Sequence, residues 1–221
     1  MDHIKQTGFD REFGPICDNL VKMSRQVDWA IERAMFAITE RDLAVANEVI
    51  SRDLEINQLR YAIEEACVVL IATQQPAAGD LRSVIAVMHM TVELERMGDH
   101  AAGIAKTVVM MQGVPMVKTL KRIPKMADLS RQMLSDCIQA FLQRDVDAAY
   151  KVAERDSEMD DLYHSVFNRL LEIMVKDEQK ISSATYMSWC AHNLERIADR
   201  VTNLAEQIIF MMTGAMRDLD K

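Results

Sequence analysis

The strongest constraint on the fold of this chain is an internal repeat. The segment Leu94–His100, LERMGDH, returns one hundred residues later as Leu194–Arg200, LERIADR. At a shift of 103, residues 41–59 also match residues 144–162, with eight identities in nineteen positions. The identical pairs are Arg41/Arg144, Asp42/Asp145, Ala46/Ala149, Val49/Val152, Arg52/Arg155, Asp53/Asp156, Glu55/Glu158 and Leu59/Leu162. The chain is therefore an internal duplication, and the change of shift places three extra residues of the first half near its Pro76–Gly79 turn.

Both copies are poor in residues that break helices. The chain has seven glycines and four prolines, and the stretch of about ninety residues between Pro124 and Gly214 contains neither. Apolar residues recur at every third or fourth position, which is the pattern of amphipathic helices, in residues 10–40, 42–73 and 80–111. The sequence predicts an all-α fold of six long helices, each of roughly 25 to 35 residues.

Turn signals divide these helices into two groups of three. Turns are expected at Arg41-Asp42, at Gln74–Asp80, at Gln112–Pro115 and at Arg144-Asp145, with Asp42 and Asp80 as helix N-caps. The third of these turns is the best boundary between the halves. We therefore expect two tandem antiparallel three-helix bundles, residues 1–113 and residues 114–221.

Composition and charge exclude several classes of protein. Lys and Arg number 26 against 34 Asp and Glu, so the net charge of −8 disfavours direct binding to nucleic acid or to an anionic membrane. The longest apolar run, Ala66–Ala72, is far shorter than the ~18 residues of a spanning helix, and the N-terminus lacks an apolar signal region. The four cysteines are widely separated, which indicates buried reduced thiols. These features predict a cytoplasmic protein.

Acidic residues spaced four apart recur on consecutive helices of each half. One helical face carries both members of each pair, and like charges on one face are tolerated best when a cation lies between them. The first half offers Asp53/Asn57 and Glu95/Asp99, and the second offers Asp156/Asp160 and Glu195/Asp199. Antiparallel packing of neighbouring helices would bring each half's two pairs together. Because most surface positions differ between the halves, the recurrence of these acids favours a site over a solvated face.

Oxygen ligands of this kind suit hard or borderline cations. Iron, manganese, magnesium and calcium fit best, zinc is a further candidate, and several acids can bridge more than one ion. Two other readings stay open: a metal-free helical scaffold, and a carboxylate-bridged metalloenzyme. The first would show no metal-dependent stability, and the second would need an open metal position.

Histidines and catalytic motifs argue against an enzyme. No histidine is kept in both halves, and no Glu-x-x-His motif of ferritin-like bundles is present, although His100 could assist a metal in the first half. The sequence contains no glycine-rich phosphate loop, no Gly-x-Ser-x-Gly and no Cys/His nucleophile pair. We expect a protein without catalytic activity.

With these residues described, the chain closely resembles the PhoU family, accessory proteins of the bacterial phosphate-specific transport system. The resemblance covers nearly the whole length and is carried by QPAAGDLR (75–82), ELERMGD (93–99) and HNLERIADRVTNLAE (192–206). It implies two tandem three-helix bundles whose E(D)xxxD motifs bind metal clusters. Those motifs fall on Glu95/Asp99, Asp156/Asp160 and Glu195/Asp199, and Asp53 heads a fourth.

Two departures from the family pattern affect these motifs. Asn57 replaces the second acid of the fourth motif, so the first half has one charge fewer and should bind metal more weakly. Ala198 and Arg200 stand where the first repeat has Gly98 and His100. On an ideal helix Arg200 points about 100° away from Asp199, so we expect it to leave the second site intact.

The resemblance also implies a function. Such a protein would be a cytoplasmic negative regulator of phosphate uptake and of a phosphate-responsive two-component pathway. Its partners would be the ATPase subunit of the phosphate ABC importer and a sensor histidine kinase. It would form a homodimer, bind no nucleic acid, and reach the membrane only through those partners.

Overall fold

The all-α prediction is confirmed by a computed structural model, which describes residues 8–115, 117, 121–215 and 219. Within these residues the chain forms α-helices and one short 3-10 helix, and no strand. The elements are α1 (Gly8–Glu40), α2 (Leu43–Gln74), α3 (Ala78–Met110), α4 (Arg122–Gln143), α5 (Val146–Ala153), α6 (Asp156–Lys176), η1 (Glu178–Lys180) and α7 (Ile181–Thr213). None of the described helices is both long enough and apolar enough to cross a membrane.

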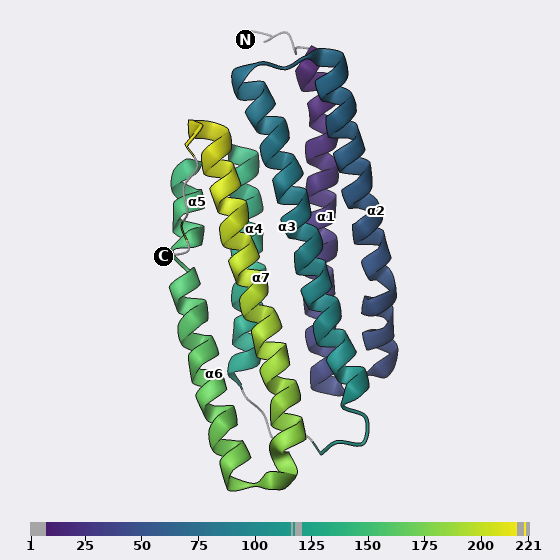
Figure 1. The fold of residues 1–221 in the computed structure, drawn as a ribbon, viewed down its shortest axis with the longest axis vertical. Coiled ribbons are helices and arrows are strands. Elements are labelled where there is room, and N and C mark those ends of the chain that lie inside the picture. The colour runs from purple at the N-terminus through teal and green to yellow at the C-terminus, as the bar shows by residue number, and fades with distance from the viewer. Residues whose placement is uncertain (1–7, 116, 118–120, 216–218, 220–221) are drawn as a thin grey trace.

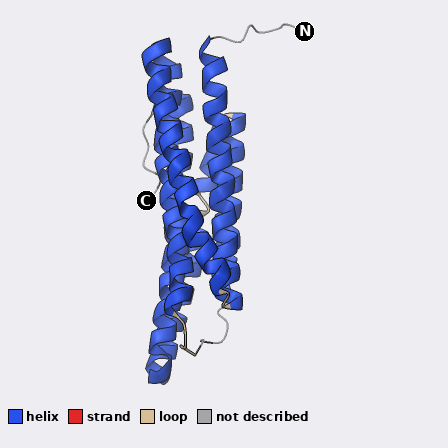
Figure 2. Ribbon diagram, turned by 90° about the vertical axis from the view of Figure 1, so that its right-hand side faces the viewer, coloured by secondary structure: helices blue, strands red, loops and turns tan. Residues whose placement is uncertain are grey.

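The helices of the two halves lie side by side along one long axis (Figures 1 and 2). In the first half α1, α2 and α3 pack on one another, and in the second α4, α5, α6 and α7 do so. The halves meet where α3 packs against α7 and where α1 packs against α4. The helices α3 and α7 run in opposite directions at the centre of Figure 1, and α2 and α6 lie at opposite edges. The division into domains 1–113 and 114–221 stays a prediction.

Of the two expected N-caps, Asp42 is confirmed and Asp80 is wrong. Asp42 accepts hydrogen bonds from the backbone N–H groups of Ala44 and Val45, at 2.9 and 3.0 Å. Its repeat counterpart Asp145 caps α5 in the same way. Asp80 caps nothing, because α3 begins earlier, at Ala78, and Asp80 lies in its first turn.

The replacement Asp42→Ala should destabilise the protein by about 1 kcal/mol, because it leaves N–H groups at the start of α2 without an acceptor. Asp80→Ala is the matched control. It removes a favourable charge from the first turn of α3 but no capping bond, so it should cost under about 0.5 kcal/mol. Urea unfolding at pH 7 would measure both, and equal losses for the two variants would contradict this assignment of the caps.

The fifth of the six expected long helices is interrupted by a short turn, so that it forms α5 and α6. The chain leaves α5 after Ala153 and begins α6 at Asp156. In the first half the same position lies inside α2, where Arg52 pairs with Glu48 and Glu55 of its own helix.

One of the differences between the repeats favours this break. The counterpart of Glu48 is Lys151, which stands four residues before Arg155, and like charges at that spacing destabilise a helix. Arg155 instead turns to α4, where it donates to Asp136 and Gln132 at 3.0 and 3.2 Å. The break lets α6 start at Asp156, so that its acidic first turn lies at the positive end of the helix dipole.

The core is aliphatic and rich in methionine. Most of the described methionines are buried, among them Met23, Met90, Met97, Met126 and Met133, as expected if they fill gaps between helices. Cys67, Cys137 and Cys190 are buried free thiols, while Cys17 is partly exposed. Burial raises the pKa of Cys17 to about 12, so this thiol is unreactive at neutral pH.

A polar seam joins α3 to α7, and we define it by Glu93, His100, Asn193, Arg200 and Asn203. Glu93 accepts from Arg200 at 3.2 Å and from Asn203 at 3.1 Å. The repeat counterpart of Glu93 is Asn193, whose Oδ1 lies 3.0 Å from Nδ1 of His100, the counterpart of Arg200. The two contacts are thus related by an approximate twofold axis. The seam fixes α3 against α7 and so sets the relative position of the halves.

The second contact between the halves, between α1 and α4, is consistent with the same approximate twofold axis. Arg131 of α4 donates two hydrogen bonds, of 2.7 and 3.0 Å, to Asp28 of α1, and these residues occupy equivalent positions of the repeats. A rotation of 180° about an axis through both contacts therefore exchanges the halves. It places the α2/α3 and α6/α7 pairs on the same face of the molecule.

Candidate functional site: two carboxylate sets

The predicted site residues form two sets, one in each half. The first set is Asp53 and Asn57 of α2 with Glu95 and Asp99 of α3, and the second set is Asp156 and Asp160 of α6 with Glu195 and Asp199 of α7. Asp99 and Asp160 are exposed, and the other six residues are partly buried. The antiparallel packing of α2 on α3 and of α6 on α7 is as expected.

In the first set the acids lie close enough to influence one another. The pKa of Asp53 is raised by burial in the first place, and then by the negative charges of Asp99 and Glu95. Asn57 donates to Asp53 Oδ2 at 3.2 Å, while the buried Asp53 Oδ1 accepts no hydrogen bond from the described residues. Position 98 is a glycine whose missing Cβ would lie 3.4 Å from that oxygen, so α3 approaches Asp53 closely.

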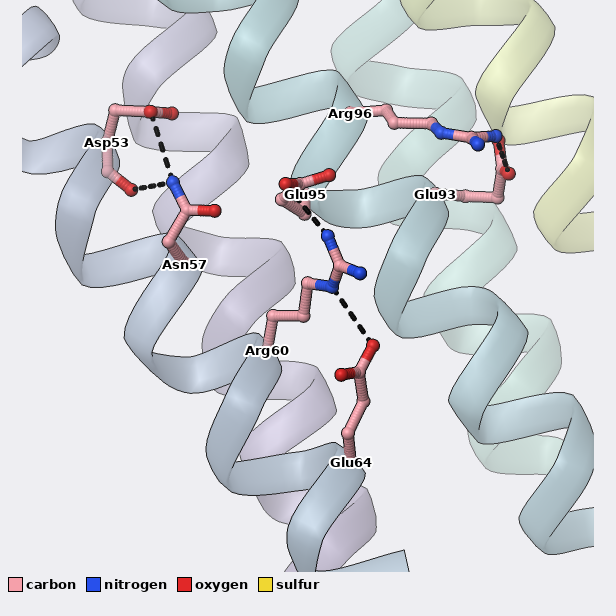
Figure 3. Close-up of polar contacts among 7 residues, drawn as sticks. All are labelled: Asp53, Asn57, Arg60, Glu64, Glu93, Glu95 and Arg96. Atoms are coloured by element: carbon pink, nitrogen blue, oxygen red, sulfur yellow. Dashed lines mark hydrogen bonds and ion pairs between the residues drawn. The ribbon is translucent and has the colours of Figure 1, made fainter.

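Arg60 of α2 places a cation in the first set. Figure 3 shows its guanidinium between the carboxylates of Glu95 and Glu64. It donates to Glu95 Oε1 of α3 at 3.0 Å and to Glu64 Oε1 of its own helix at 2.9 Å. The Glu95 side chain is 14% exposed and that of Arg60 27%, so this ion pair is partly shielded from water. The charge of Glu95 is therefore already compensated across the helix interface.

In the second set the carboxylates are less well compensated. The pKa of Glu195 is raised to about 7, first by burial and then by the charges of Asp199, Asp160 and Asp156, against the opposing effect of Arg196. The Glu195 side chain is 19% exposed, and its buried Oε2 accepts no hydrogen bond from the described residues.

Two basic residues of α7 border this set. Arg196 pairs with Asp199 one turn along the same helix. His192 brings its Nδ1 to 3.4 Å from Glu195 Oε2 and is itself exposed. The pKa of Asp199 is raised by burial despite Arg196. Ionising the whole second set is therefore unfavourable unless further positive charge is supplied.

The donor sets differ in how well they suit a cation. Among the described residues, no three His, Cys, Asp or Glu side chains converge in the arrangement of a metal site. The second set suits an ion better by its chemistry, because all four of its residues are carboxylates, three of which raise the pKa of the fourth, Glu195. The buried Oε2 of Glu195 also accepts no hydrogen bond from the described residues. The first set fits poorly, because Arg60 binds Glu95 and an amide replaces one acid.

Two expectations about residues beside the sets can now be resolved. His100 places its Nδ1 3.0 Å from Asn193 Oδ1 of α7, and this contact does not support the suggested assistance to a metal in the first half. Arg200 bonds to Glu93, away from Asp199, as the helical angle predicts.

Sequence reasoning missed Arg60, Glu93 and His192. One signal for the Glu93 contact was present in the sequence: both partner positions differ between the repeats. Glu93 and His100 of the first half are replaced by Asn193 and Arg200 in the second.

Comparisons with known proteins match this chain over most of its length. The family model described as PhoU domain matches residues 20–108 and again residues 123–208. A Clostridium acetobutylicum protein, named phosphate-specific transport system accessory protein PhoU homolog, is 34% identical over 213 residues, covering 96% of this chain and 97% of that protein. The Escherichia coli phosphate-specific transport system accessory protein PhoU is 32% identical over 209 residues, covering 93% and 86%.

The fold is also shared with a solved structure. The crystal structure of the phosphate transport system regulatory protein PhoU from Streptococcus pneumoniae matches with a TM-score of 0.89 at 31% identity. The match covers 95% of this chain and 99% of that one.

Proposed function

The chain belongs to the PhoU family, and from that membership we propose that it is a regulatory accessory protein of a phosphate-specific transport system. The observation that carries the proposal is the similarity over nearly the full length to proteins with that name. These relatives are named accessory and regulatory proteins, which supports a role without catalysis.

In finer detail, we propose that the protein restrains phosphate uptake and the phosphate-responsive two-component pathway. It does so in the cytoplasm by contacting the ATPase subunit of the importer and the sensor histidine kinase, and it acts as a homodimer. The net charge of −8 supports docking to basic protein surfaces. Contact with the membrane is then made through these partners alone.

The second carboxylate set supplies the proposed metal dependence. Asp156, Asp160, Glu195 and Asp199 would hold the ion, with iron, manganese, zinc, magnesium and calcium as candidates. A bound cation would neutralise these acids. The protein's own contribution is to hold α6 and α7 in register, so that one rigid face is presented to the partners. The reading of a metal-free scaffold shares the partners but needs no ion.

The metal part of this proposal is tested by elemental analysis and by partner binding. Protein purified without an affinity tag or chelator should carry metal, and the variant Glu195→Gln/Asp199→Asn should lose the metal of the second set. Chelation should weaken binding to the importer's ATPase subunit by about tenfold or more, measured by biolayer interferometry. Partner affinity that is unchanged by chelation would support the metal-free scaffold instead.

A further inference from the structure

The two carboxylate sets differ at one position of the facing helix. Arg60 of α2 corresponds, at the shift of 103, to Tyr163 of α6. Glu95 of α3 corresponds to Glu195 of α7 at the shift of 100. The same place beside the same glutamate therefore carries a guanidinium in the first half and a phenol in the second.

Arg60 makes the contacts that an ion between the helices would make. Its guanidinium joins Glu95 of α3 to Glu64 of α2, with bonds of 3.0 and 2.9 Å, and so holds the two helices together (Figure 3). An ion that binds Oε1 of Glu95 would first have to displace Arg60 from that oxygen. The displaced guanidinium would then repel a divalent cation at close range.

The cation of the second set is of another kind. Arg196 pairs with Asp199 on its own helix, three residues away, and links no second helix. Arg96, the repeat counterpart of Arg196, pairs with Glu93 and not with an acid of the first set. An arginine at this position can therefore point away from the carboxylates. Among the described residues of the second half no cation makes a bridge like that of Arg60, and Tyr163 contributes no positive charge.

We propose that Arg60 is a resident cation that takes the place of a metal ion in the first set, and that metal binding is confined to the second set. The inference rests on the metal-binding role proposed above and narrows it to one half. Asn57 acts in the same direction, because it leaves the first set with three carboxylates against four in the second. The two halves of the duplication have thus diverged into one metal-independent and one metal-dependent helix pair.

Exchanging the two residues tests the proposal. Mn²⁺ would be titrated into chelator-treated full-length protein, with the free ion followed by electron paramagnetic resonance. The variants are Arg60→Tyr, Tyr163→Arg and, as a control, Arg169→Tyr, which removes an exposed arginine that pairs with Glu172. Circular dichroism would establish that all of them fold.

The expected results have opposite signs. Tyr163→Arg should weaken Mn²⁺ binding at least about tenfold, because it places a fixed positive charge beside Glu195. Arg60→Tyr should add binding capacity, up to about twice that of the unaltered protein. It should also lower the melting temperature without metal and regain part of that loss when Mn²⁺ is added. Arg169→Tyr should bind as the unaltered protein does.

Two outcomes would overturn the inference in different ways. If Asp53→Asn/Glu95→Gln removes about half of the Mn²⁺ bound by the unaltered protein, both sets are metal sites and Arg60 does not exclude the ion. The metal part of the proposed function would then stand. If no variant binds Mn²⁺ and elemental analysis finds no other metal, both the inference and the metal part fail together.

Discussion

The replacement Glu93→Ala is expected to destabilise the protein by about 3 kcal/mol. Glu93 is 13% exposed and is bonded to Arg96, Arg200 and Asn203, while Arg200 is 16% exposed. Removing the carboxylate leaves the Arg200 guanidinium buried without its counter-charge, which costs far more than the loss of a surface ion pair. Urea unfolding would measure the change.

The equivalent contact of the seam, between Asn193 and His100, provides the model for a matched control. The double replacement Glu93→Asn/Arg200→His reproduces the contact that Asn193 and His100 make, and should recover at least half of the lost stability. Glu172→Ala, which breaks an exposed pair with Arg169, should cost under about 0.5 kcal/mol. A loss for Glu93→Ala as small as that would show that the seam contributes little.

The variant Glu93→Ala also tests whether the two halves unfold together. One tryptophan lies in each half, Trp29 on α1 and Trp189 on α7. Single-tryptophan proteins made with Trp29→Phe or Trp189→Phe would report each half by fluorescence. We expect coincident transitions with Glu93 present and separated transitions for Glu93→Ala, since the weakened seam no longer couples the bundles. Coincident transitions in both proteins would contradict this role.

The second large effect concerns pH and Glu195. Its folded-state pKa of about 7 is above the ordinary value of 4.5, because burial and the neighbouring acids oppose ionisation. The stability linked to this group is therefore complete below about pH 4.5 and is lost as the pH rises through 7. Such a shift is worth at most about 3 kcal/mol, and partial screening by water leaves about 2 kcal/mol.

Glu195→Gln should accordingly make the metal-free protein about 2 kcal/mol more stable at pH 8 and change little at pH 5. Unfolding by urea in the presence of chelator, at both pH values, is the measurement. The unaltered protein and Glu195→Gln have the same charged groups around position 195, so the difference between them reports Glu195 itself. These groups are Asp156, Asp160, His192, Arg196 and Asp199.

Glu95→Gln in the first set is the control, and the sign of its effect should be reversed. It removes the acceptor that Arg60 uses across the α2/α3 interface, so it should destabilise by about 1 kcal/mol at pH 8. Destabilisation by both glutamines at pH 8 would show that Glu195 is already compensated in the metal-free protein.

Local patterns in the sequence were enough for the helices and for the membership of the two sets. Three- and four-residue periodicity depends only on helical geometry, so the bounds of α1, α2 and α3 follow from it to within about two residues. The cap Asp42 follows from the turn signal before α2. The duplication added the pairing of α2 with α3 and of α6 with α7. The turn signals placed the start of α3 wrongly at Asp80. The break before Asp156 was missed because no glycine or proline marks that turn.

The partners of the long side chains were decided only by the tertiary structure. Arg60 and Arg196 both stand near the acids in the sequence, yet one bridges to α3 and the other pairs with Asp199 on its own helix. Sequence spacing fixes which face of a helix a residue occupies, whereas a flexible arginine can reach several acids from that face. Which acid it binds depends on how closely the neighbouring helix packs and which charges that helix brings, and this is determined by the whole fold.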